Sequence, residues 1–171
     1  MTDRLWTPWR LDYVSGSATS TSTGSCVFCE AAHGGGEDGG ALVVHRGRAC
    51  YVILNKYPYN NGHLMVVWQR HVGRLADATP GELAEAMALT RAAEMALDEA
   101  YRPHGYNTGL NIGRPAGAGV VDHLHVHVVP RWNGDTNFMT VTGETRVLPE
   151  ELPQTAARLR PIFARLTAGV R

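Results

Sequence analysis

Three histidines alternate with aliphatic residues in the segment His123-Leu124-His125-Val126-His127-Val128-Val129. Successive side chains of a strand point to opposite faces, so the three imidazoles share one face and the aliphatic side chains share the other. Imidazole can act as a nucleophile or general base near pH 7, and it also binds metal ions. The pattern is therefore consistent with phosphoryl transfer, with a metal site of three histidines, or with three hydrogen-bonded structural histidines.

A loop of small residues precedes this strand, with the sequence Arg114-Pro115-Ala116-Gly117-Ala118-Gly119. Such a loop lets backbone N–H groups approach a phosphate without obstruction by side chains. These groups are the donors that a phosphoryl-transfer centre needs, and a neutral imidazole can be its nucleophile. The combination favours phosphate chemistry over a plain three-histidine metal site.

The elements that must position these residues are predicted from hydrophobic patterning. A helix is expected from the capping box Thr79-Pro80-Gly81-Glu82 to about Tyr101. The tail over 150–166 also has a helical pattern, which Pro153 and Pro161 are expected to break into short pieces. Five runs have the length and composition of strands, the first three forming an antiparallel meander: 41–45, 50–54, 64–68, 106–112 and 124–129.

Length and composition predict one α+β domain with its own core, since the chain has 171 residues of which 44% are hydrophobic. We divide it into an N-terminal segment with a flexible loop (1–25), a core (26–135) and a C-terminal extension (136–171). Lys plus Arg and Asp plus Glu number 16 each, so the net charge gives no reason to expect nucleic acid or a membrane surface as a partner. Neither a signal peptide nor a membrane span is recognisable, and we expect a cytoplasmic protein.

Together these segments resemble the histidine-triad (HIT) superfamily, whose signature is this alternation of three histidines with apolar residues. The resemblance extends from about Cys26 to Trp132 and includes the turn Gly62-His63. It implies an α+β fold with an antiparallel sheet of about five strands, one long helix and a short C-terminal helix. It also implies a homodimer.

Three further segments resemble the branch of this superfamily that contains bacterial diadenosine tetraphosphate phosphorylases. They are Leu5-Trp6-Thr7-Pro8-Trp9-Arg10, Tyr57-Pro58-Tyr59-Asn60-Asn61-Gly62-His63 and Pro130-Arg131-Trp132-Asn133-Gly134-Asp135-Thr136-Asn137-Phe138. Many hydrolase and phosphoramidase members carry Gln beside Ser or Thr in the phosphate loop, whereas this chain has Ala118-Gly119-Val120 and Asp122. The missing Gln argues against simple hydrolysis. In the phosphorylases, inorganic phosphate rather than water discharges the adenylyl-histidine.

The resemblance also assigns roles to individual residues. Its catalytic set is His125 as the nucleophile, His127 on the reacting phosphate and His63 as a hydrogen-bonding support of the triad. Asn55 stands where the family binds ribose hydroxyls, and Ile53 corresponds to an apolar wall of the base pocket. The full nucleotide-binding set is Ile53, Asn55, Asn111, Gly117, Ala118, Gly119 and His127.

The pair Cys26-x-x-Cys29 has the spacing of a metal or redox site, with two unpaired thiols in a loop as the alternative. Zinc-containing members of the family combine such a pair with a strand-terminal histidine and the first triad histidine, which correspond to His71 and His123. These residues would complete a closed Cys₂His₂ tetrahedron around a structural Zn²⁺. The other two triad histidines then stay free of metal.

The expected reaction is a double displacement on an adenosine nucleotide or dinucleoside polyphosphate. His125 attacks the α-phosphorus, and inorganic phosphate or water then releases ADP or AMP. No catalytic divalent ion is needed in the pocket, although Mg²⁺ can accompany a polyphosphate substrate. Two alternatives stay open: a dinucleoside polyphosphate hydrolase or nucleoside phosphoramidase, and a non-catalytic nucleotide-binding zinc module. The complete triad counts against the second.

Overall fold

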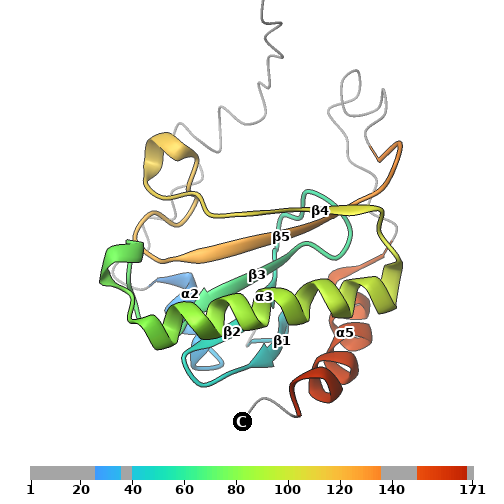
Figure 1. The fold of residues 1–171 in the computed structure, drawn as a ribbon, viewed down its shortest axis with the longest axis horizontal. Coiled ribbons are helices and arrows are strands. Elements are labelled where there is room, and N and C mark those ends of the chain that lie inside the picture. Colours follow the sequence, from blue (N-terminus) through green and yellow to red (C-terminus); the bar gives the residue numbers. More distant parts are fainter. Residues whose placement is uncertain (1–25, 36–39, 136–149, 169–171) are drawn as a thin grey trace, which may run out of the picture.

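The computed structural model of the chain describes residues 26–35, 40–135 and 150–168. They contain a five-stranded antiparallel sheet in the order β1-β2-β3-β5-β4, with helices packed against it (Figure 1). The strands are β1 (Val43–Arg46), β2 (Cys50–Leu54), β3 (Leu64–Trp68), β4 (Gly105–Gly109) and β5 (His125–Arg131). The predicted α+β class and its five strands are confirmed.

Some predicted features fall outside the described residues. These are the N-terminal segment 1–25 with its flexible loop and the motif over 5–10, and the end of the motif over 130–138. The division into N-terminal segment, core and extension therefore stays a prediction. In the described ranges, no helix is long and apolar enough to cross a membrane.

The central strands carry the triad on a rigid support. β2 and β3 are buried along their whole length, which explains why their sequences are continuous apolar runs rather than alternating ones. β3 pairs with β5 so that Met65 lies opposite His127 and Val67 lies opposite His125. Three predicted strands have different ends in the structure: the run 41–45 is β1 at 43–46, the run 106–112 is β4 at 105–109, and the run 124–129 is β5 at 125–131.

Helix α3 (Pro80–Tyr101) begins with the capping box that the sequence predicts. The Thr79 hydroxyl accepts a hydrogen bond from the amide of Glu82 at 3.3 Å, and the Glu82 carboxylate accepts one from the amide of Thr79 at 2.7 Å. The buried face of α3 is mostly alanine, so the helix can lie close across the sheet (Figure 1). It ends at Arg102, which has a left-handed φ of 48° and precedes Pro103.

The C-terminal helix corrects one prediction, because α5 (Leu152–Thr167) is continuous rather than broken into short pieces. Pro153 lies in the first turn, where a missing N–H costs nothing. Pro161 lies inside the helix on its exposed side, and the opposite side buries Leu159 and Phe163. Packing of that apolar side on α3 and β1 holds the helix together across the proline.

Three short helical pieces replace stretches that the sequence left as loops. They are α2 (Val27–Ala32), η1 (Leu75–Asp77) and η2 (Arg114–Ala116). Cys26 is the residue that precedes α2, and Cys29 lies within it. The Cys pair thus sits on a helical turn, not in an open loop.

Candidate active site and metal centre

His125 is buried on β5, with 4% of its surface exposed. Its Nδ1 lies 2.8 Å from the carbonyl oxygen of His123. A carbonyl can only accept, so Nδ1 carries the proton and Nε2 keeps its lone pair. The ring therefore presents an unprotonated nitrogen, as a nucleophile requires.

His127 has the opposite tautomer, and a backbone amide determines it. The amide of Tyr59 donates to His63 Nδ1 at 3.2 Å, so the proton of His63 is on Nε2. That nitrogen lies 3.0 Å from His127 Nδ1 and donates to it. His127 consequently carries its own proton on Nε2, which makes this nitrogen a donor. The predicted support of the triad by His63 is directed at His127.

The turn before His63 is specific to glycine. Gly62 has φ of +77°, and a Cβ at this position would lie 2.9 Å from Leu97 Cδ2. Tyr59 closes the other side of the turn, with its ring stacked on that of His63 at a centroid distance of 4.8 Å. The turn therefore delivers the imidazole of His63 into the space between Tyr59 and His127.

Burial keeps both inward histidines neutral. It lowers the pKa of His125, an effect that the hydrogen bond to the His123 carbonyl partly opposes. Burial, together with the neighbouring His125, lowers the pKa of His127 to about 4. Both rings are therefore uncharged near pH 7, in agreement with the tautomers that the hydrogen bonds assign.

The small-residue loop is only partly as expected. It forms the 3₁₀ turn η2, and the amides of Gly117 and Ala118 turn inward to the carbonyls of Arg114 and Gly113, at 3.0 and 3.4 Å. Gly117 has φ of +86° and gives the loop its reversal. Within the described residues no hydrogen bond occupies the amide of Gly119, which is exposed. Of the amides of Gly117, Ala118 and Gly119, it is therefore the one left available to an anion within the described residues.

The remaining predicted nucleotide contacts lie at the ends of β2 and β4. Ile53 is buried on β2. Asn55 follows that strand, and its backbone amide donates to the backbone carbonyl of His63 at 2.9 Å. The Asn55 side chain accepts from the amide of Tyr57 at 2.9 Å. Asn111 lies beyond β4 in the connection to η2 and is half-buried. Their contacts with a nucleotide stay predictions.

The four predicted metal ligands come together. The ligand atoms of Cys26, Cys29, His71 and His123 all lie within 4.8 Å of one another. Nδ1 of His123 is 3.3 Å from Cys26 Sγ and 3.6 Å from Cys29 Sγ. Nδ1 of His71 is 3.3 Å from Cys29 Sγ. Among the described residues, His123 is the only triad histidine in such a cluster, which argues against a three-histidine metal site.

The sulfur-to-nitrogen distances of 3.3–3.6 Å in this cluster fit zinc. Tetrahedral zinc with ordinary Zn–S and Zn–N bonds keeps neighbouring ligand atoms about 3.3–3.8 Å apart. Nε2 of His123 donates to the Trp68 carbonyl at 2.6 Å, which leaves Nδ1 unprotonated toward the two sulfurs. Burial alone would raise the pKa of Cys26, but the polar contact with the His123 side chain and hydrogen bonds from the backbone amides of Cys29 and Phe28 lower it to about 6. A thiolate is the form that binds a metal.

Several contacting residues were missed by sequence reasoning. Phe28 lies between the two cysteines and packs its ring on two imidazoles. The distance between ring centroids is 4.9 Å to His125 and 5.5 Å to His123. The buried Tyr51 hydroxyl donates to the Phe28 carbonyl at 2.7 Å. Tyr59 and Asn60 lie in the motif over 57–63, which was the only sequence signal for them. The resemblance assigned no role to either residue.

Comparison with known proteins agrees with this geometry. Residues 40–134 match the model of the HIT domain family. The chain is 46% identical over 167 residues to the AP-4-A phosphorylase of Mycobacterium tuberculosis, which covers 95% of this chain and 85% of that protein. It is 29% identical over 136 residues to the asymmetrical bis(5'-nucleosyl)-tetraphosphatase of Schizosaccharomyces pombe, which covers 70% of this chain and 74% of that protein.

Among solved structures, a Zn-bound histidine triad family protein from Mycobacterium smegmatis superimposes with a TM-score of 0.68 at 30% identity, covering 84% of this chain and 96% of that one. The family model alone spans more than half of the chain, and it includes His63, the small-residue loop and the whole triad. The chain therefore belongs to the HIT family, and within it resembles the AP-4-A phosphorylases.

Proposed function

We propose that this protein is a nucleotidyl transferase that cleaves diadenosine tetraphosphate by phosphorolysis through an adenylyl-histidine. The observation that carries the proposal is the pair of opposite tautomers on β5. His125 offers a lone pair on Nε2, and His127, one step along the same face, offers an N–H on Nε2. A nucleophile beside a donor is the arrangement that attack on a phosphate diester needs.

The reaction follows from these two nitrogens. In the first step, Nε2 of His125 forms a bond to the α-phosphorus, and the bond from that phosphorus to its bridging oxygen breaks. ATP leaves with the bonding electrons. The N–H of His127 and the amide of Gly119 donate to the phosphate oxygens on which negative charge increases.

In the second step, an oxygen of inorganic phosphate attacks the adenylyl phosphorus and the P–N bond breaks. ADP is released, and the electron pair returns to Nε2 of His125. The proton stays on Nδ1 throughout, hydrogen-bonded to the His123 carbonyl, so the nucleophile is regenerated in its original tautomer.

Zinc would be held by Cys26, Cys29, His71 and His123, and when bound it supplies structure rather than chemistry, because all four positions are protein ligands. The backbone carbonyl of His123 also accepts the hydrogen bond from Nδ1 of His125. The described residues contain no cluster of carboxylates that could hold Mg²⁺. Magnesium enters this proposal only as an ion bound to the polyphosphate substrate.

Phosphorolysis is favoured over hydrolysis by the 46% identity to an AP-4-A phosphorylase and by the absence of Gln from the loop. The 29% identity to a tetraphosphatase supports hydrolysis as the second candidate. The test is incubation with diadenosine tetraphosphate in ¹⁸O-labelled water, with and without inorganic phosphate. Unlabelled ADP plus ATP, formed only with phosphate, is the expected result. Labelled AMP plus ATP formed without phosphate would establish the hydrolase instead.

Two properties of the whole protein complete the proposal. A homodimer is supported by the exposed apolar side chains of Leu83, Met87 and Met95 on α3 and by the outer edge of β4, which pairs with no further strand of the described residues. A mass near twice 18.6 kDa in light scattering is expected. A cytoplasmic location is supported by the Cys pair, because thiolate ligands need a reducing compartment.

A further inference from the structure

Asn60 joins the turn that carries His63 to the end of the triad strand. Its side-chain amide donates to the Pro130 carbonyl at 3.0 Å and to the Asp135 carboxylate at 2.8 Å. The backbone carbonyl of Asn60 accepts a hydrogen bond from the backbone amide of His63 at 3.1 Å. One residue therefore bonds on one side to the end of β5 and on the other side to the histidine that supports His127.

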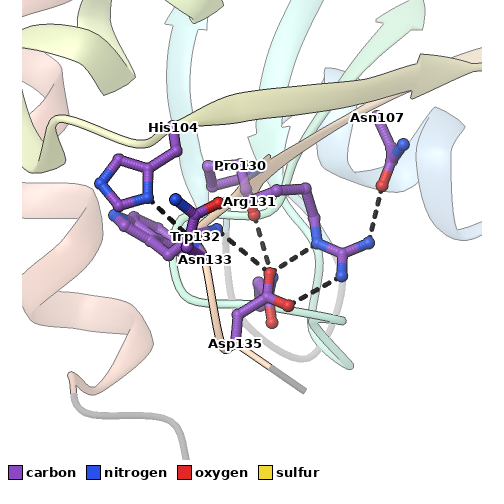
Figure 2. A network of polar contacts seen from close by, with 8 residues as sticks. His104, Asn107, Pro130, Arg131, Trp132, Asn133 and Asp135 are labelled. Carbon is purple, nitrogen blue, oxygen red and sulfur yellow. Dashed lines mark hydrogen bonds and ion pairs between the residues drawn. The ribbon is translucent and has the colours of Figure 1, made fainter.

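Asp135 is firmly placed to receive this bond. Arg131 donates to it through Nε at 2.6 Å and through a terminal nitrogen at 2.8 Å, and the amide of Trp132 adds a third donor at 3.2 Å. Figure 2 shows the Arg131 guanidinium between Asp135 and Asn107 of β4, whose side-chain oxygen it contacts at 2.8 Å. Arg131 holds the pKa of Asp135 well below its usual range, so the acceptor stays ionised. A charged acceptor strengthens each of these hydrogen bonds.

The backbone amide of Tyr59, the residue before Asn60, determines the tautomers of His63 and His127. The Tyr59 amide is the donor to His63 Nδ1, and a backbone amide cannot accept. If this amide moved away, the His63 proton could shift to Nδ1. His63 Nε2 would then accept rather than donate, and His127 would have to turn its proton toward His63. The N–H of His127 that faces the phosphate would be lost.

We propose that Asn60, anchored by Pro130 and Asp135, is a positioning residue that keeps the Tyr59 amide on His63 and so fixes the tautomers of His63 and His127. Among the described residues, Asn60 makes no hydrogen bond to His125 or His127, so it acts through the backbone of the turn. Its effect on turnover rests on the proposed function, whereas its effect on the tautomers does not.

The experiment compares the full-length, zinc-loaded protein with Asn60→Ala and Asp135→Asn. Histidine ¹⁵N spectra of the ligand-free protein report which ring nitrogen carries the proton. We expect Nε2–H alone on both rings in the wild type, and a mixture of Nε2–H and Nδ1–H on His63 and His127 in each variant. The kcat for phosphorolysis should fall by about tenfold in Asn60→Ala while KM changes by less than about threefold, because the lost donor serves the transition state.

Glu82→Gln is the matched control, since Glu82 also accepts from an arginine through two nitrogens and from a backbone amide, but at the start of α3. Its histidine spectra should equal those of the wild type. Thermal unfolding shows whether each variant is folded. Asp135→Asn is isosteric, so it still tests the proposal if Asn60→Ala fails to fold. Wild-type tautomers in both folded variants would overturn the proposal, whatever their turnover. A wild type without phosphorolysis would instead refute the proposed function and leave the tautomer result standing.

Discussion

The histidines of the triad differ in the work that each ring nitrogen does. His123 directs Nδ1 to the cysteines and Nε2 to a carbonyl, His125 donates from Nδ1, and His127 accepts at Nδ1. The alternation of the strand predicted that the three rings share a face. The tautomer of His127 could not be predicted, because it depends on the conformation of a turn more than sixty residues earlier in the chain.

Removal of the nucleophile is the sharpest test at this scale. His125→Ala should lower kcat for diadenosine tetraphosphate at least about a thousandfold, since no other ring presents a lone pair to the phosphorus. AMP binding, measured by calorimetry, should stay within about threefold of the wild type, because the base and ribose contacts are untouched. Turnover near the wild-type rate in this variant would eliminate the proposed intermediate.

Among the elements, those with strong local signals were predicted best. The capping box fixed the start of α3, and the apolar runs gave β2 and β3 with their observed ends. The continuity of α5 was missed because the cost of Pro161 is offset by packing on α3 and β1, which a local reading does not contain. Helix α2 was missed because its six residues are too few to show a period.

The start of α3 has a pH-dependent contribution to stability. Hydrogen bonds from Arg70 and from the amide of Thr79 lower the pKa of Glu82 to about 2, from an ordinary value of 4.5. A carboxyl whose pKa is lower in the folded state stabilises the protein fully above pH 4.5, and this contribution is lost as the pH falls toward 2. The urea midpoint of Glu82→Gln should therefore be below that of the wild type at pH 7, with the difference narrowing between pH 4.5 and 2. A difference that is constant with pH would contradict this account.

For the whole molecule, the predicted zinc site joins parts that are distant in sequence. Its ligands come from the start of α2, from the chain just after β3, and from His123, two residues before β5 begins. The sequence could predict this ligand set only through resemblance to a family, because spacing alone identifies the Cys pair and leaves the two histidines open. The contact between the rings of Phe28 and His125 adds a physical link from this site to the proposed nucleophile.

Metal removal should destabilise the fold as a whole. A ligand present at a hundred to a thousand times its Kd stabilises by about 3–4 kcal/mol, so chelation should lower Tm by roughly 6–16 °C for a chain of this size. Cys29→Ser should lower the zinc content measured by mass spectrometry well below one ion per chain. Cys50→Ala is the control, because Cys50 is fully buried away from the cluster and should leave the zinc content unchanged. Equal Tm values with and without chelator would show that the site has no structural role.

The pairing of β5 with β3 has a consequence for how this protein can change over evolution. A deletion or insertion of one residue between His123 and His127 would turn Leu124 and Val126 toward the phosphate and send imidazoles into the apolar interior. A change of two residues would keep the faces but move the nucleophile away from the carbonyl of His123. The length of this short stretch should therefore be far less variable among descendants than the identity of its aliphatic residues.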